Sequence, residues 1–175
     1  MAETTAAAQP ITTDWVHGFV ERWLAAVNSR RPERVLELMT DDVVYHDSGW
    51  PQTMCGHAET GEFLAWLWRA FPDATFECLG SPLVDLDGSR AAFWWRGRMT
   101  NRGSINPPGI RASGRSVEYE GADFHEYRDG QVARLRIVFD MNDVLRQLGL
   151  LPARGSLAEG VMVAMQVLGT RLRRS

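Results

Sequence analysis

The sequence predicts a single α+β domain in which helices come first and a run of antiparallel strands follows. Three observations carry this prediction. The chain has 175 residues, the size of one ordinary domain. Apolar residues recur at helical spacing in the first 71 residues, and then alternate with polar residues up to residue 140. This segregated order is typical of α+β domains and not of parallel sheets.

The N-terminal part predicts three helices. The first spans 13–28, because one helical stripe there is apolar: Trp15, Val16, Phe19, Val20, Trp23, Leu24 and Val27. The second covers 32–39 and starts with a proline, which suits a first helical turn. The third covers 58–71 and stops at the proline that follows.

The rest of the domain predicts strands. They are bounded by Gly, Pro and Asp-Gly signals and span 43–45, 74–79, 83–86, 91–100, 116–127 and 131–140. Asp87-Gly88 and Asp129-Gly130 predict hairpin turns. Residues 101–114 are too rich in Gly, Pro and Ser for either element, so we expect a loop at the rim of a site or over it.

We divide the chain into a disordered tail at 1–12, a domain at 13–152 and a helical extension at 153–175. The domain ends with a short helix at 141–151. A last amphipathic helix at 157–172 follows a break, and we expect it to cover the site or to contact another subunit.

Composition limits the classes of partner and cofactor. The net charge is -3 with both signs interspersed, which favours no nucleic-acid partner. We see no leader peptide and no bilayer-spanning run, so we expect a cytoplasmic protein without a membrane partner. Cys55 and Cys78 lack zinc-ligand spacing, and we expect both to be reduced and buried. Nucleotide-binding motifs are absent too, so the sequence predicts no cofactor and no metal.

Three stretches resemble one known family. They are GHAETGEFLAWLWRAFPDATFE, SVEYEGADFHEYRDGQV and IVFDMNDVLRQLGLLP. They are similar to SnoaL-like polyketide cyclases, a branch of the nuclear transport factor two-like superfamily, over about residues 13–152. The resemblance implies a half-cone, in which N-terminal helices pack on a curved antiparallel sheet around an apolar pocket. Cyclases, isomerases, dehydratases, epoxide hydrolases and non-catalytic binders share this scaffold, so the resemblance leaves the reaction open.

Asp140 is the first catalytic candidate. It ends an apolar strand, where a carboxylate has no packing role and could transfer a proton. The resemblance also places it at the acid/base aspartate of the aromatic polyketide cyclases. The alternative is that Asp140 only N-caps the helix that begins at Met141.

The strand 116–127 supplies a second group of candidates. Alternation places four polar side chains on one face, which we expect to line the pocket: Tyr119, Asp123, His125 and Tyr127. The resemblance implies an apolar aromatic where this chain has His125. An Asp/His pair can hold one imidazole tautomer and exchange protons near neutral pH, so His125 is a catalytic candidate and Asp123 a substrate-binding one. The alternative for Asp123 is a structural role in binding backbone.

His46, Asp47 and Trp50 follow the first short strand, where the resemblance implies a turn over the pocket mouth. We take His46 as a further acid/base candidate. The alternative is an ordinary surface histidine.

Aromatic side chains predict the kind of ligand. The chain has seven tryptophans, more than a core of this size needs, and aromatic rings suit a flat apolar molecule. We assign substrate binding to Tyr45, Trp50, Trp66 and Trp94. The alternative for most tryptophans is core packing.

The last strand presents a difficulty for Asp140. Its apolar row consists of Ala133, Leu135, Ile137 and Phe139, whereas Asp140 shares its parity with Arg136. Either the row faces another subunit or packs against helices while the mixed face lines the pocket, or a bulge changes the register before Asp140. In the first case Arg136 pairs with Asp140 and binds a substrate oxygen. An exposed apolar row also predicts a homodimer joined through the sheet.

These observations predict a cofactor-independent cyclase or isomerase of polyketide-like natural-product biosynthesis, in the lyase/isomerase class. Its ligand would be an apolar polycyclic or polyketide-like small molecule, with Asp140 and His125 or His46 moving the proton. One alternative is epoxide opening, for which Arg136, Asp140 and Asp123 are the available site members. Another is a non-catalytic binding protein.

Overall fold

The structure is a computed structural model that describes residues 11–106 and 109–172. Most of the predicted tail at 1–12 therefore lies outside the described residues. Its last residue, Thr12, belongs to the first helix as the N-cap, because its side chain accepts a hydrogen bond from the Trp15 N–H at 3.2 Å.

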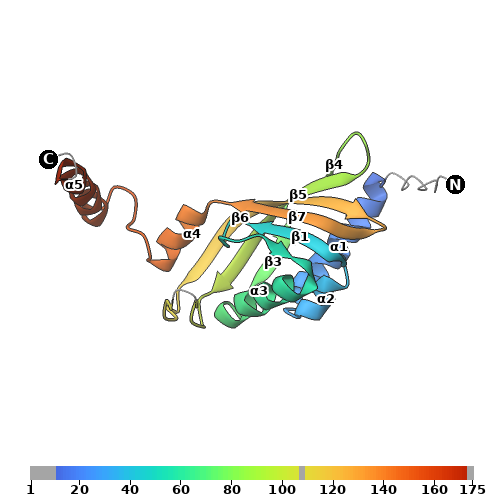
Figure 1. Cartoon of the computed structure of the whole chain (residues 1–175), viewed down its shortest axis with the longest axis horizontal. Coiled ribbons are helices and arrows are strands. Elements are labelled where there is room, and N and C mark those ends of the chain that lie inside the picture. The colour runs from blue at the N-terminus through green and yellow to red at the C-terminus, as the bar shows by residue number, and fades with distance from the viewer. Residues whose placement is uncertain (1–10, 107–108, 173–175) are drawn as a thin grey trace.

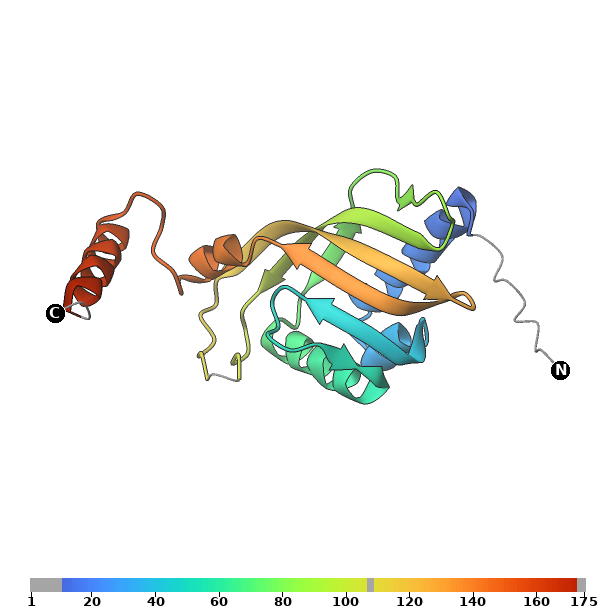
Figure 2. The same cartoon turned by 45° about the horizontal axis from the view of Figure 1, so that its top comes forward.

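Three helices lie on one side of the sheet (Figures 1 and 2). They are α1 (Thr13–Asn28), α2 (Pro32–Leu36) and α3 (Gly56–Ala70). The predicted second helix runs too far, because Met39 already belongs to the first strand. Pairing of that strand with the last one outweighs a short helical pattern, as tertiary contacts commonly outweigh propensity.

Seven strands form one curved sheet. They are β1 (Met39–Asp47), β2 (Met54–Cys55), β3 (Thr75–Cys78), β4 (Leu83–Val84), β5 (Arg90–Thr100), β6 (Ser116–Arg128) and β7 (Gln131–Phe139). Their order is β2-β1-β7-β6-β5-β3, with β4 pairing β5. The α+β half-cone predicted from the sequence is confirmed.

One strand pair differs from the predicted antiparallel sheet. Strand β7 lies parallel to β1, with Tyr45 opposite Leu135, while the other pairs are antiparallel. The hairpins from β5 to β7 return the chain to β1, and no hairpin joins β1 to β7. A crossover pairing of this kind leaves no turn signal in the sequence.

The apolar row of β7 faces inward. Leu135 is 1% exposed, and Ile137 and Phe139 line an internal cavity together with Phe93 and Trp95 of β5. The expectation that this row joins two subunits is therefore wrong, since the chain's own helices cover it. The register shifts that the structure describes for β7 also lie away from Asp140: one is opposite Glu126 and Tyr127 of β6, and the other is opposite the stretch from Met39 to Val44 of β1.

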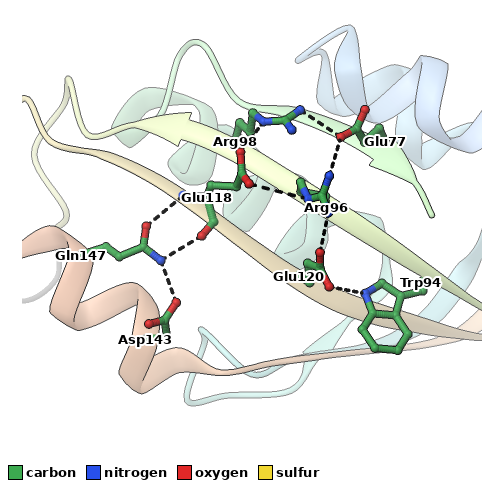
Figure 3. A network of polar contacts seen from close by, with 8 residues as sticks. All are labelled: Glu77, Trp94, Arg96, Arg98, Glu118, Glu120, Asp143 and Gln147. Carbon is green, nitrogen blue, oxygen red and sulfur yellow. Dashed lines mark hydrogen bonds and ion pairs between the residues drawn. The ribbon is translucent and has the colours of Figure 1, made fainter. Parts of the chain in front are cut away.

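The outer face of the sheet carries a network of charged side chains (Figure 3). Arg96 and Arg98 alternate with the carboxylates of Glu77, Glu118 and Glu120, and the shortest of these contacts on Arg96 is 2.7 Å, to Glu120. Exposed ion pairs contribute little stability each, so this network mainly gives the outer face its polar character.

Helix α4 (Met141–Leu148) is fastened to β6 by Gln147 (Figure 3). The Gln147 side chain accepts from the Glu118 N–H at 3.0 Å and donates to the Glu118 carbonyl at 2.8 Å. It also donates to Asp143 at 2.7 Å. This anchoring holds the apolar side of α4, including Val144 and Leu148, against the cavity.

Helix α5 (Leu157–Leu172) stands away from the body of the protein (Figures 1 and 2). Among its described side chains, Leu157 is 92% exposed and Met165 63% exposed, and none of them lines the cavity. Its predicted role as a cover or an oligomer contact stays a prediction. No described helix combines the length and the apolar character needed to cross a membrane.

Candidate functional site

A cavity of about 200 Å³ lies between the inner face of the sheet and helices α1, α3 and α4. Its walls are almost entirely apolar, with Phe63, Trp66 and Trp68 from α3 and Leu148 from α4 among them. The polar side chains that line it are few: Tyr45, Asp47, Tyr119 and Asp123. An apolar hollow with a few converging polar groups is the usual form of a small-molecule site.

Asp47 is a carboxyl group of the cavity wall with a raised pKa. Strand β1 alternates, so Val43, Tyr45 and Asp47 point inward, and Asp47 ends the strand inside the cavity wall. Burial raises the pKa of Asp47 from 3.8 to about 6, because the ionised form loses its hydration there. Two donors oppose this shift: the Gly49 N–H at 2.7 Å and the Tyr45 hydroxyl at 3.2 Å.

Asp123 sits on the inner face of β6, where two indole N–H groups and an imidazole surround its carboxylate. The Trp95 indole donates to Oδ1 at 2.6 Å, and the Trp23 indole donates to Oδ2 at 3.2 Å. The His125 Nε2 lies 3.4 Å from the same Oδ2. The two indole donors, from α1 and β5, satisfy a buried carboxylate and fix its orientation.

His125 lies behind Asp123 and does not line the cavity. It is 1% exposed, and its Nδ1 is 3.1 Å from the Tyr127 hydroxyl. Aromatic rings surround the imidazole edge-on, with Trp23 at 4.7 Å and Phe93 at 5.1 Å between ring centroids. The predicted Asp/His pair is therefore present in the fold, with Asp123 between the histidine and the cavity.

Glycines in the strands make room for these rings. A side chain at Gly121 would place Cβ 2.5 Å from a Trp95 ring carbon, so only glycine allows that indole to reach Asp123. Gly97 stands opposite Tyr119, and a Cβ there would lie 2.9 Å from Phe76 and 3.2 Å from Tyr119. Glycine within a strand often marks such a close approach.

The predicted substrate-binding residues divide between the inside and the outside of the sheet. Tyr45, Trp66 and Asp123 line the cavity. Trp50 packs against Trp66 at 4.8 Å between ring centroids, just behind the wall. Trp94 is 57% exposed on the outer face, where it donates to Glu120 at 3.1 Å.

Three other candidates also lie away from the cavity. Arg136 is exposed on the outer face of β7. His46 is exposed too, with its Nδ1 3.1 Å from the Thr53 hydroxyl. Asp140 caps α4 by accepting from the Asp143 N–H at 3.1 Å, and its side chain is 58% exposed. The structure thus places Asp140 in the capping role that the sequence left open, and does not assemble Arg136, Asp140 and Asp123 into one site.

Asp47 is the residue that sequence reasoning passed over in favour of its neighbour His46. The signal was available, because Val43, Tyr45 and Asp47 share one parity. The predicted strand stopped at residue 45, whereas β1 extends to Asp47 and carries it into the wall.

Metal-ligating side chains do not gather at this site. Among the described residues no group of three or more His, Cys, Asp or Glu could hold a metal ion. Both cysteines are free. Cys55 is exposed and Cys78 is only partly buried, so the predicted burial of both was wrong.

Comparison with known proteins identifies relatives of this fold. The model of the SnoaL-like domain family matches residues 20–135. No curated protein matches the sequence.

Solved structures with the same fold come from several proteins. AclR, a candidate hydroxylase from Streptomyces galilaeus, is 20% identical, with a TM-score of 0.68 over 93% of this chain and 97% of that chain. A candidate SnoaL-like polyketide cyclase from Jannaschia sp. CCS1 is 21% identical, with a TM-score of 0.69 over 84% and 99%. SalBIII, an epoxide hydrolase/cyclase-like enzyme with a role in pyran ring formation in the polyether salinomycin, is 20% identical, with a TM-score of 0.59 over 73% and 92%. At these identities the likeness shows the fold alone.

Proposed function

The chain belongs to the SnoaL-like domain family, and from this premise we propose a cofactor-independent cyclase or isomerase that acts on a polyketide-like molecule by acid/base chemistry. One observation carries the proposal: Asp47 lies in an apolar cavity and has a pKa of about 6. A group whose pKa is close to the working pH can both accept and return a proton, which is the requirement for general acid/base catalysis.

The proposed reaction begins with proton transfer to Asp47. Its carboxylate takes a proton from the carbon beside a substrate carbonyl, and the C–H electron pair moves onto the carbonyl to give an enolate. The enolate carbon then attacks a second carbonyl, and the new carboxylic acid returns its proton to the alkoxide that forms. Where the enolate is conjugated with a double bond, the acid instead protonates the far carbon of this dienolate, which gives an isomer. Tyr45 and Gly49 hold the carboxylate in one orientation through both steps.

Asp123 and His125 support this site from the wall. The buried Asp123 carboxylate adds to the raised pKa of Asp47, after the larger effect of burial. Its two indole donors and His125 keep Asp123 oriented, so we propose a positioning role for His125.

Hydrogen–deuterium exchange tests the proposal without the natural substrate. The two-ring ketone 2-tetralone in deuterated buffer should exchange its protons beside the carbonyl when the protein is added, as followed by NMR. The rate should rise as the pH passes through about 6, since the base is the ionised form of Asp47. Asp47→Asn should reduce the rate by roughly 10²–10⁴-fold.

Asp140→Asn is the matched control, because Asp140 is the exposed carboxylate at the α4 cap. Exchange that survives Asp47→Asn and is lost in Asp140→Asn would overturn the assignment and restore Asp140 as the base. Binding of 2-tetralone without exchange in the wild type would favour a non-catalytic binder.

Epoxide opening is the second candidate, and the protonated form of Asp47 favours it. A carboxylic acid with a pKa of about 6 can give a proton to an epoxide oxygen while an internal hydroxyl or water attacks carbon, and the carboxylate that remains can take the proton that the attacking group releases. Incubation of a hydroxy-epoxide in ¹⁸O-water distinguishes these routes, because a labelled diol reports water attack and an unlabelled cyclic ether reports ring closure. Recovery of unchanged epoxide would exclude this function for the compound used.

A further inference from the structure

The size of the cavity limits the ligand. Its volume of about 200 Å³ lies below the roughly 300–1,000 Å³ that is usual for sites of drug-sized ligands. It is somewhat larger than an apolar cavity of roughly 150 Å³, which binds benzene. One or two rings therefore fit inside this space, and a flat four-ring molecule would extend beyond it.

Tyr119 offers the cavity a hydroxyl that the protein does not use. Its ring is clamped by Trp95, at 5.5 Å between centroids, and by Phe139, at 5.1 Å. We find no hydrogen-bond partner for this hydroxyl among the residues that the structure describes. Tyr45 donates to Asp47, and Asp123 accepts from two indoles, so these side chains of the wall are occupied. The Trp68 indole N–H, which also belongs to the wall, is buried without a partner among the described residues and is a second free donor.

The Tyr119 hydroxyl stays protonated and can therefore donate a hydrogen bond. Burial raises the pKa of Tyr119 above its ordinary value of 10.0, and the nearby charges of Asp47 and Asp123 add to this effect. The phenol thus keeps its proton at all working pH values. A ligand that leaves this donor unpaired pays a desolvation cost, so a ligand with an acceptor oxygen is favoured.

The neighbouring strand β5 leaves room for the Tyr119 ring. Gly97 stands opposite Tyr119 on β5, and its missing side chain leaves the space in which the Tyr119 and Phe76 rings meet. Any larger residue at Gly97 would crowd the Phe76 ring first and the Tyr119 ring next.

We propose that the ligand is an apolar compound of one or two rings with a carbonyl oxygen, and that this oxygen accepts a hydrogen bond from Tyr119. The proposal rests on the acid/base function above and names the substrate class of that same cavity. A carbonyl held by Tyr119 would also be the group that activates the neighbouring carbon toward Asp47, since both residues line one cavity.

Ligand binding measured by calorimetry tests the proposal with three probes. The probes are 2-tetralone, its hydrocarbon counterpart tetralin, and the four-ring 5,12-naphthacenequinone. The wild type should bind 2-tetralone about 2- to 13-fold more tightly than tetralin, the factor that one net hydrogen bond gives. The four-ring quinone should not bind in the cavity.

Tyr119→Phe should bring 2-tetralone down to the affinity of tetralin while leaving tetralin within about twofold. Unchanged tetralin binding shows that the variant keeps its fold and its cavity. Tyr127→Phe is the matched control, because Tyr127 shares the strand and face but does not line the cavity. An equal ratio of the two affinities in wild type and Tyr119→Phe would overturn the role of Tyr119, and tight binding of the quinone would overturn the size limit.

The outcomes separate this proposal from the proposed function. Selective binding of 2-tetralone without hydrogen exchange would support the ligand class and refute the catalysis. Exchange that persists in Tyr119→Phe with an unchanged affinity ratio would refute the ligand contact and leave Asp47 as the base.

Discussion

Replacing Asp47 by Asn should change how the stability of the protein depends on pH. Between pH 3.8 and about 6 the folded state binds more protons than the unfolded state, because burial raises the pKa of Asp47 in the fold. The free energy of unfolding must therefore fall as the pH rises through this window. The amide side chain of the Asp47→Asn variant cannot ionise, so this contribution to the fall in the free energy of unfolding is absent from the variant.

The magnitude follows from the size of the shift. A change from 3.8 to about 6 corresponds to about 3 kcal/mol when Asp47 is ionised in both states, as at pH 8. At pH 5 the folded carboxyl is mostly protonated, and the cost is only about 1.6 kcal/mol. Between pH 5 and pH 8 the wild type should therefore lose about 1.4 kcal/mol more than Asp47→Asn.

Urea denaturation at pH 5 and pH 8 measures this double difference. Other titrating groups are shared by the two proteins and cancel. The stronger hydrogen bonds that Tyr45 and Gly49 give to the ionised carboxylate are already contained in the folded-state pKa of Asp47. Asp140→Asn, which changes an exposed carboxylate, is the matched control. Parallel pH profiles for wild type and Asp47→Asn would show that Asp47 titrates near its ordinary pKa, and the acid/base proposal would then lose its basis.

Three further predictions concern packing and assembly. Gly121→Ala places a methyl group 2.5 Å from an indole carbon and should lower the free energy of unfolding by about 1–3 kcal/mol in urea, whereas Gly160→Ala, with open space around it, should not. Gln147→Ala removes two hydrogen bonds to the β6 backbone and should lower the free energy of unfolding by about 1–3 kcal/mol in urea, and no change would show that the apolar side of α4 alone holds the helix. We still expect a homodimer joined through the sheet, but through its outer face, where Phe124 is exposed. Light scattering should then give twice 19.7 kDa for the wild type and 19.7 kDa for Phe124→Asp. A monomeric wild type would contradict this prediction.

Local patterns were enough to predict most elements of the fold. The helical stripe of α1 and the alternation of β5 and β6 depend on residues close in sequence, so their burial follows from periodicity alone. The parallel pairing of β1 with β7 depends on residues about 90 positions apart, such as Tyr45 and Leu135. The pattern of apolar and polar residues within either strand does not indicate which strand lies beside it. The prediction of a purely antiparallel sheet was therefore wrong for this pair.

The site was predicted in part for the same reason. Alternation along β6 correctly placed Asp123 and His125 on the inner face. The apolar row of β7 was assigned to a dimer because its cover, the N-terminal helices, is distant in sequence. Asp47 was missed because the predicted strand stopped two residues too early. The alternation was therefore not extended to Asp47, whose side chain points inward.

The raised pKa of Asp47 and the small cavity have one physical origin. Rings from α3, β5 and β6 line the half-cone, and the strand glycines let those rings approach one another closely, so that the surroundings of Asp47 are largely apolar. A buried carboxylate in such a wall keeps its proton to a higher pH, since apolar groups replace part of the water that would stabilise its charge. A wider cavity would admit larger ligands but also more water, which would return Asp47 toward an ordinary carboxyl. In this chain the limit on ligand size and the base strength of Asp47 are therefore coupled, and both are set by the packing of the same rings.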